Sequence, residues 1–384
     1  MDMSIKRLIV EERVTGDPLT VRLLELLPGL PVEIVESARS AITQNPRRDD
    51  SIILAQHDGS FVKDFPVTTG SPPCGEKYVL SLLNCPFSCS YCYLRSYLGH
   101  MRIVVFTNTE TMKCEIAEVL AAERPKRLTT GEMGDSLALD HHTGITLELL
   151  PLFTGTDTLF EVRTKSERID HLLALVSDLQ QVNGRVRDQY ANGAPNGNEA
   201  RGSLENLLIT WTLGPDEAIR REEPGTASLD ERLRAMRRAR DAGIRVAIRF
   251  DPIIPFYADL DAYDRLMGGL SDAVGTGGLH RVELGVLRFP PGLWEWIRGR
   301  NPRSPLLRGE YLRDRDGKIR LYRPMRITLY RNMVRLIRAR CLSVPIELCM
   351  ESVSVWEDAG LEPPTAENLL IRGRHDGPEP STAE

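Results

Sequence analysis

Apolar, β-rich runs alternate with helical patterns along this chain, and that alternation limits its possible folds more than any other feature. Most of the runs are continuously apolar, as expected of parallel strands buried on both faces. Helical patterns cover 109–123 and 228–243, and the second begins at a capping box of Ser228 and Glu231 and stops at Gly243. The sequence therefore predicts a parallel α/β sheet, open or closed into a barrel, with functional groups at the carboxyl ends of its strands. The predicted strands are 77–84, 102–108, 127–132, 158–166, 207–214, 245–254, 281–287 and 344–351.

The strand–helix pattern also divides the chain. Residues 1–76 precede it and read as strand, helix, strand, which predicts a small N-terminal α/β domain before a main unit over 77–358. Residues 182–203 are rich in Asn and Gly without periodicity, so we expect an inserted surface loop or lid. Residues 359–384 form a C-terminal extension whose last part, "IRGRHDGPEPSTAE", is predicted to be disordered.

Composition and sequence patterns indicate the cellular compartment of the protein. Hydrophobic residues make up 41% and charged residues 27% of the 384 positions, which is ordinary for a globular protein in solution. The beginning, "MDMSIKRLIVEER", has no signal-peptide core, and no run of about 18 apolar residues predicts a membrane span. The seven cysteines include one tight cluster, which is unlike a secreted disulfide scaffold. These features predict a cytoplasmic protein with reduced thiols and no membrane partner.

Charge is unevenly distributed. The net charge is −5, yet residues 298–340 contain fourteen Lys or Arg against three acidic residues, a local charge of +11. This stretch predicts either a phosphate-facing surface or a solvated helix face.

Three cysteines lie within eight positions, as Cys85, Cys89 and Cys92 with the spacing C-x3-C-x2-C. They follow the predicted strand 77–84. A structural zinc site normally has four protein ligands, for which His100 is the nearest candidate. A disulfide within the loop is a further alternative, disfavoured in a reducing compartment. Three thiolates on one loop are best suited to a [4Fe–4S] cluster that keeps one iron free of protein ligands.

The cysteine spacing, with Tyr91 before the last cysteine, resembles the signature of radical S-adenosylmethionine (radical SAM) enzymes. In that superfamily the reduced cluster cleaves SAM, and the resulting 5′-deoxyadenosyl radical abstracts hydrogen from the substrate. The stretch "TTGE", Thr129 to Glu132, is similar to the element that receives the SAM ammonium group. A glycine turn with a solvated Glu132 is the structural alternative.

A closer resemblance covers roughly residues 5–358, apart from the insertion 182–203. The segments "CSYCYL", "FEVRTKS", "ITWTLGPDEAIRREEPGTASLDERL", "RFDPIIP", "LRFPPGL" and "LCMESVSVW" are similar to those of the spore photoproduct lyase family. The resemblance implies a partial (β/α)6 radical SAM barrel with a small N-terminal α/β domain. It also implies a [4Fe–4S] cluster, SAM and an external electron donor of the flavodoxin or ferredoxin type.

Site residues follow from the same resemblance. Cys85, Cys89 and Cys92 would hold the cluster, and Tyr91 and Tyr93 would act near the adenine and in hydrogen return. The residues that would contact SAM are Tyr91, Gly131, Glu132, Lys165, Ser166, Thr210, Thr212 and Asp251.

One departure concerns the reaction itself. The family's dimer-repair enzymes carry a hydrogen-donating cysteine just after the strand that corresponds to 127–130. Here the sequence reads "GEMGD", which places Glu132, or Met133 in a shifted register, at that point. Cys349, Cys74 and Cys114 are other thiols, each of which also reads as a small buried hydrophobe.

The departure leaves several functions open. The sequence favours a radical SAM enzyme that acts on a small nucleoside or nucleotide-type substrate, in a biosynthetic role. The alternative is a DNA repair lyase that splits a pyrimidine dimer with another hydrogen donor. An iron–sulfur protein used for sensing or structure is a third, non-enzymatic reading, against which the SAM-side residues argue.

Overall fold

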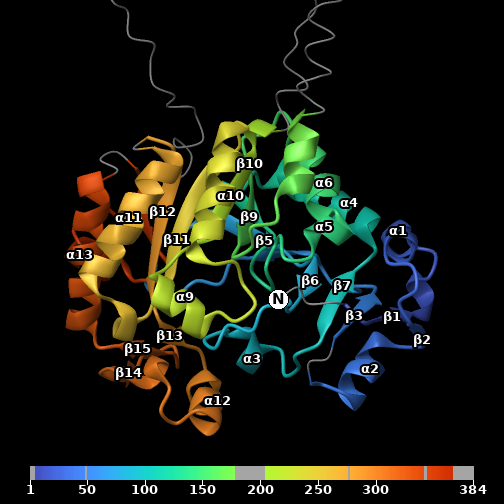
Figure 1. Ribbon diagram of the computed structural model, residues 1–384, viewed down its shortest axis with the longest axis horizontal. Coiled ribbons are helices and arrows are strands. Elements are labelled where there is room, and N and C mark those ends of the chain that lie inside the picture. Colours follow the sequence, from blue (N-terminus) through green and yellow to red (C-terminus); the bar gives the residue numbers. More distant parts are fainter. Residues whose placement is uncertain (1–4, 48–49, 178–203, 276, 341–343, 366–384) are drawn as a thin grey trace, which may run out of the picture.

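The computed structural model describes residues 5–47, 50–177, 204–275, 277–340 and 344–365, which form three β-sheets surrounded by helices (Figure 1). The predicted insertion 182–203 lies outside these ranges, as does the C-terminal extension beyond residue 365. Short 3-10 turns cover Glu12–Val14, Leu150–Phe153, Pro255–Tyr257 and Pro305–Leu307. The helices are α1 Pro18–Leu26, α2 Ala38–Gln44, α3 Leu94–Tyr97, α4 Thr109–Ala122, α5 Asp140–Thr143, α6 Ile145–Leu149, α9 Asp216–Glu222, α10 Leu229–Asp241, α11 Leu260–Val274, α12 Leu293–Arg300, α13 Arg323–Arg340 and α14 Val353–Asp358.

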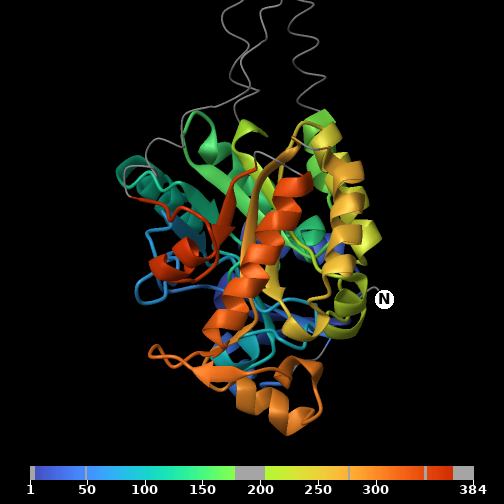
Figure 2. The ribbon, with the colours of Figure 1, turned by 90° about the vertical axis from the view of Figure 1, so that its left-hand side faces the viewer.

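The main sheet has eight strands in the order β16-β12-β11-β10-β9-β8-β5-β4. All neighbours pair in parallel except β4 and β5, and the sheet curls into a half-barrel with α10, α11 and α13 on its outer side (Figures 1 and 2). This confirms the predicted partial α/β barrel. Its strands are β4 Val62–Asp64, β5 Glu76–Val79, β8 Arg127–Thr129, β9 Leu159–Thr164, β10 Leu207–Thr212, β11 Arg245–Ile253, β12 Leu279–Val286 and β16 Ile346–Leu348.

A second, five-stranded sheet has the order β2-β1-β3-β7-β6 and lies beside the main sheet with α1 and α2 (Figure 1). Its strands are β1 Arg7–Glu11, β2 Val32–Val35, β3 Ser51–Ala55, β6 Leu82–Leu83 and β7 Ile103–Phe106. A small third sheet, β13-β15-β14, joins α12 at the lower end of the molecule and comprises β13 Arg288–Phe289, β14 Tyr311–Arg313 and β15 Ile319–Leu321.

One strand prediction was wrong, and another strand was predicted correctly but belongs to the second sheet. The predicted strand 77–84 is two strands, because β5 pairs in the main sheet whereas β6 pairs antiparallel with β7 in the second sheet. The predicted strand 102–108 becomes β7, which pairs with β3 rather than with a barrel strand. Both runs are apolar and largely buried, and apolar character alone does not say which of two neighbouring sheets a strand joins. Chain segments therefore pass between the sheets on both sides of residue 76.

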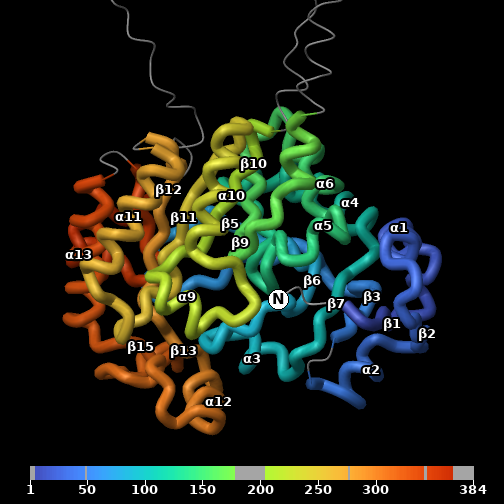
Figure 3. Tube along the Cα trace, in the orientation of Figure 1, coloured from blue at the N-terminus to red at the C-terminus, as the bar shows by residue number. Residues whose placement is uncertain are grey.

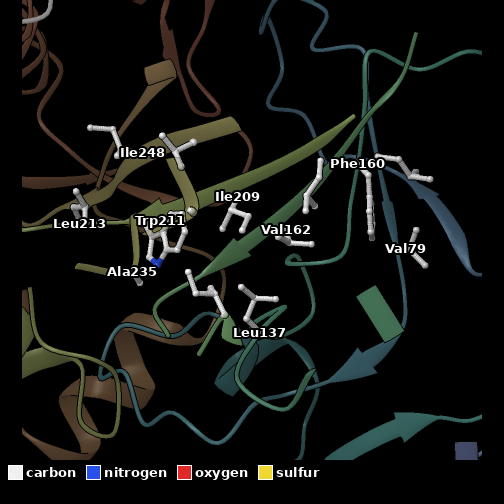
Figure 4. Close-up of a cluster of buried hydrophobic side chains, with 14 of the residues drawn as sticks. Val79, Leu137, Phe160, Val162, Ile209, Trp211, Leu213, Ala235 and Ile248 are labelled. Atoms are coloured by element: carbon white, nitrogen blue, oxygen red, sulfur yellow. The ribbon is translucent and has the colours of Figure 1, made fainter. Parts of the chain in front are cut away.

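The two faces of the main sheet differ in chemistry. Phe160, Val162, Ile209, Trp211 and Ile248 form part of a hydrophobic cluster on the outer side of β9, β10 and β11, where the helices cover them (Figure 4). Most of the alternate positions on the same strands, among them Glu161, Thr210 and Arg249, face the inside of the half-barrel and carry polar or charged groups. The expectation of strands that are apolar on both faces is therefore wrong for the inner face.

Buried ion pairs line this inner face, and some of them connect strands on opposite sides of the opening of the half-barrel. Arg127 on β8 contacts Glu76 on β5 and, at 2.8 Å, Glu347 on β16 at the far edge of the sheet. Lys126 also reaches Glu347, at 3.1 Å. Burial alone would raise the pKa of Glu347, but Arg127 and Arg281 outweigh it and hold that pKa well below its ordinary value. The two edges of the half-barrel are thus joined by charge rather than by backbone pairing.

No helix in the described ranges has both the length and the apolar character to cross a membrane.

We predict that Arg127→Met will lower the free energy of unfolding by about 3–5 kcal/mol, because it leaves buried Glu76 and Glu347 without their shared cation. Urea denaturation followed by circular dichroism measures this. Arg234→Met is the matched control, because Arg234 pairs with Asp230 on the exposed face of α10 and its loss should cost at most about 1 kcal/mol. Equal, small losses in the two variants would contradict a structural role for the inner network.

Candidate functional site at the cysteine loop

The cysteines lie on a loop, residues 84–93, that runs from β6 into α3 along the lower side of the main sheet (Figure 3). Backbone hydrogen bonds hold this loop on two sides. The amides of Ser88 and Ser90 donate to the carbonyls of Pro224 (2.9 Å) and Glu222 (2.8 Å). The amide of Asn84 donates to the Met133 carbonyl (2.9 Å). The loop is therefore fixed between the turn after β8 and the turn after α9.

All three cysteines of the loop are free thiols, and Cys89 is buried. Burial raises the pKa of the Cys85 thiol to about 12, and the neighbouring Asp135 and Cys92 add to that shift. Burial likewise raises the pKa of Cys89. Cys85 and Cys92 add to the rise at Cys89, so the three thiols share one electrostatic environment. Their sulfur atoms do not all lie within 4.8 Å of one another, which is a wider spacing than a single zinc ion requires. His100, the proposed fourth zinc ligand, instead accepts a hydrogen bond at Nδ1 from the Arg102 amide (3.2 Å).

Lys165, which follows directly after β9, places a positive charge beside the cysteine loop. Its ammonium lies 5.7 Å from the ring centre of Tyr91. Burial disfavours the charge, but Cys89 and Glu223 outweigh burial and raise the pKa of Lys165. The Tyr91 hydroxyl donates to Glu223, which Arg232 holds in turn at 2.5 Å. A positive charge therefore lies beside Tyr91, and its neighbours Cys89 and Glu223 favour the charged form.

Glu223 and Asp135 are site residues that sequence reasoning missed. Asp135 accepts hydrogen bonds from the amides of Leu137 (3.0 Å) and Lys165 (2.6 Å) and from the Thr164 hydroxyl (2.7 Å). It thereby fixes the turn after β8 to the end of β9. The adjacent acidic pair 222–223, within a segment already noted for its family resemblance, was the available signal for Glu223.

Tyr93 and Glu132 meet on the other side of the loop. The Tyr93 hydroxyl lies 2.6 Å from the Glu132 carbonyl oxygen and 3.0 Å from its Oε1. Burial raises the pKa of Glu132, while Arg163 opposes that rise. Gly131 packs so tightly that a Cβ there would lie 2.4 Å from Arg163 Cβ. Only glycine therefore fits beside Glu132 without displacing β9.

Asp251 lies within a second cluster at the carboxyl ends of β11, β12 and β16. Its carboxylate accepts from Arg249 (2.8 Å) and Arg288 (3.0 Å), and Arg288 also lies 3.2 Å from Cys349 Sγ. Ligand atoms of Asp251, Glu283 and Cys349 lie within 4.8 Å of one another, a grouping that could in principle hold a metal ion. The two arginines already supply positive charge there, which disfavours a metal cation. Because β8 to β12 and β16 pair in parallel, this cluster lies at the same carboxyl edge of the sheet as the turns after β8 and β9.

Three further predicted residues have polar partners of their own. The Thr210 hydroxyl donates to Glu161 (2.5 Å) on the inner face of the sheet, and Ser166 Oγ accepts from the Arg168 amide (3.1 Å). Thr212 is buried, and its carbonyl accepts from Arg232 (2.8 Å). The structure therefore brings Cys85, Cys89, Cys92, Tyr91 and Lys165 together, and Tyr93 with Gly131 and Glu132, while Thr210 lies deeper in the half-barrel.

A small cavity of about 70 Å³ opens at the seam between the two edges of the main sheet. Cys74 and Cys349 both line it, together with Glu283, Glu347 and Trp356. The Trp356 indole N–H is buried without a hydrogen-bond partner in the described part of the chain.

The curled parallel sheet and the three thiols on one loop at its strand ends define a partial barrel of the radical SAM type. No family model matches the chain. In sequence the chain is similar to the spore photoproduct lyase of Geobacillus sp. (strain Y412MC61), with 25% identity over 187 residues, 48% of this chain and 47% of that protein. It is similar to the Bacillus subtilis (strain 168) spore photoproduct lyase at 23% identity over 223 residues, 57% of each chain. These matches span about half the length of the curated relatives.

Solved structures extend the similarity over most of the chain. A spore photoproduct lyase complexed with dinucleoside spore photoproduct has a TM-score of 0.71 and 20% identity, covering 91% of this chain and 100% of the other. A double mutant of a spore photoproduct lyase with bound AdoMet and the same dinucleoside has a TM-score of 0.69 and 19% identity, covering 90% and 99%. Sequence and structure thus confirm the resemblance to spore photoproduct lyases, and the structures establish the shared fold.

Proposed function

We propose that the protein is a radical SAM enzyme. The observation that carries this is the loop, fixed by backbone hydrogen bonds, on which three free thiols lie next to Tyr91, whose ring is 5.7 Å from the ammonium of Lys165. Three cysteine thiolates are the donor set of a [4Fe–4S] cluster with one open iron. When bound there, the cluster and SAM would supply a 5′-deoxyadenosyl radical for hydrogen abstraction, and one spore photoproduct lyase of the same fold has AdoMet bound.

The chain's own residues would hold and orient these groups. Cys85, Cys89 and Cys92 would bind the cluster, and Lys165 would pair with the SAM carboxylate. Glu132 beside Gly131 would accept the SAM ammonium, since its carboxylate is buried and faces the loop through Tyr93. The remaining proposed SAM contacts are Tyr91, Ser166, Thr210, Thr212 and Asp251, of which Thr210 and Asp251 would first have to exchange their present partners.

For the substrate we propose a small nucleoside or nucleotide-type molecule, in a biosynthetic role. The turn after β8, where the repair enzymes carry a hydrogen-donating cysteine, presents Glu132 and the thioether of Met133 instead. Neither has an S–H bond with which to quench a carbon radical.

Pyrimidine-dimer lysis is the second candidate function, and Cys349 is the observation that favours it. This buried free thiol lies beside Arg288 and Asp251 at the carboxyl end of β16. Burial raises the pKa of Cys349 well above its ordinary value, which keeps it as the S–H form that a hydrogen donor requires. The relatives with dinucleoside spore photoproduct bound support the same alternative.

We expect anaerobically reconstituted protein to bind about four irons and four sulfides per chain, as a [4Fe–4S] cluster requires. Replacing Cys85, Cys89 and Cys92 together with Ala should abolish the absorption shoulder of the cluster and its iron. Cys114→Ala is the control, because Cys114 is exposed on α4 and should leave iron content unchanged. A full cluster in the triple variant, or preferential zinc binding by the parent, would disprove the central proposal.

Lys165→Ala should weaken SAM binding about tenfold or more with unchanged iron content, because losing one partner of a charge-assisted contact costs roughly 1.5–3 kcal/mol. Isothermal titration of SAM into the reconstituted protein measures the affinity. Lys113→Ala on the surface of α4 controls for lost charge and should bind SAM like the parent. An affinity equal to that of the parent would remove Lys165 from the SAM site.

The substrate class is tested by formation of 5′-deoxyadenosine under dithionite. We expect free nucleotides to stimulate its formation more strongly than duplex DNA that contains a pyrimidine dimer. Turnover of the irradiated DNA to intact thymines, with salt-sensitive binding of the oligonucleotide, would overturn the metabolite proposal. In that case loss of turnover in Cys349→Ala would identify the hydrogen donor.

A further inference from the structure

The basic stretch 298–340 divides into two parts of different character. On α13 three of the six arginines pair with carboxylates: Arg323 with Asp358 (2.6 Å), Arg326 with Glu351 (2.8 Å) and Arg340 with Asp264 (2.9 Å). This part of the stretch is therefore about half neutralised by the protein itself, and the exposed remainder lies on α13, away from the cysteine loop (Figure 1).

The segment 293–308, which consists of α12 and the turn after it, keeps its positive charge. It contains four arginines and one acidic residue, Glu295, which pairs with Arg313 outside the segment. All four arginines are exposed, and none forms an ion pair with a carboxylate of the described ranges; they are Arg298, Arg300, Arg303 and Arg308. We call this segment the α12 patch.

The α12 patch is in contact with the cysteine loop. Leu293 and Ile297 of α12 share one buried cluster with Cys89 and Tyr91, and Trp296 packs against it. The Trp296 ring lies between two guanidiniums, with Arg300 Cζ 4.0 Å and Arg95 Cζ 5.0 Å from its centre. Arg95 Nε in turn donates to the Cys89 carbonyl (3.1 Å). A short series of contacts therefore joins the exposed arginines to the loop that carries the thiols.

This placement matches the need of the proposed cluster for an electron. Electron transfer slows steeply with distance, so a protein donor must dock close to the cysteine loop. Plant-type ferredoxins are low-potential carriers and, like flavodoxins, are acidic, so a cationic surface attracts them and accelerates encounter.

We propose that the α12 patch is the docking surface for an acidic, low-potential one-electron carrier. The inference rests on the proposed function, since it names the partner that would reduce the cluster. The carrier transfers one electron to the oxidised cluster and is itself oxidised by one electron, without making or breaking a covalent bond.

The test is anaerobic stopped-flow reduction of the reconstituted protein by a reduced plant-type ferredoxin, followed by bleaching of the cluster. For the variant R298E/R300E/R303E we expect the second-order rate constant to fall at least tenfold at low salt, with a weaker salt dependence than the parent. The control R331E/R335E/R338E carries the same change of charge on the exposed face of α13 and should stay within about twofold of the parent.

Dithionite separates failure of this inference from failure of the proposed function. If dithionite does not reduce the parent, no functional cluster is present and both proposals fall. If dithionite reduces every protein equally but ferredoxin reduces the α12 variant as fast as the parent, the docking surface alone is disproved. An equally slow reduction of the α13 control would also disprove the docking surface, because the net charge of the protein, and not the position of the arginines, would then determine the rate. Oligonucleotide binding that only the α12 variant loses, with normal reduction by ferredoxin, would assign the patch to phosphates instead.

Discussion

Buried ion pairs inside the half-barrel are the constraint on which the rest of the structure depends. Desolvating so many charges is tolerable only because each carboxylate there has a cation within contact. Some of these pairs join strands that share no backbone ladder: Arg281 on β12 meets Glu161 on β9, and Arg127 on β8 meets Glu347 on β16. They involve Lys126, Arg127, Arg163, Arg249, Arg281 and Arg288 on one side and Glu76, Glu132, Glu161, Asp251, Glu283 and Glu347 on the other. Buried ion pairs therefore stabilise the curvature of the sheet that positions the site loops.

Sequence reasoning found what local spacing encodes. The strands β9 to β12, the capping box of α10 and the cysteine triplet were predictable because each depends on residues a few positions apart. The buried ion pairs inside the half-barrel and the contacts of the cysteine loop were not predictable, because they join residues far apart in the sequence. Tyr91 meets Glu223 across 132 positions, and Asp135 meets the Lys165 amide across 30. The same reason explains β7, whose apolar run fits either sheet until β3 is placed beside it.

Glu132 and Met133 occupy the turn after β8 where the repair enzymes carry their hydrogen-donating cysteine. Glu132 does not lie in solvent, as the structural alternative for "TTGE" had it; it is largely buried and hydrogen-bonded to Tyr93. A carboxylate at this point binds cations and hydrogen-bond donors, whereas a cysteine there could deliver a hydrogen atom. The two chemistries are not interchangeable, so the same fold would have to complete its reaction differently here. Cys349 approaches the mouth from the opposite edge of the sheet, and only the dimer-lysis alternative requires it.

Charge balance also bears on how a substrate would be recognised. Arg249 and Arg288 at the barrel mouth are already paired with Asp251 and Glu283, so the mouth has no large net field to attract an anion. An anionic group would have to displace Asp251 from Arg288, gaining one charged contact while giving up another. Selection must therefore come from the direction of hydrogen bonds and from shape rather than from net charge. Four arginines without a carboxylate partner in the described ranges lie instead on the α12 patch, outside the mouth, where long-range attraction serves a protein partner better than a small ligand.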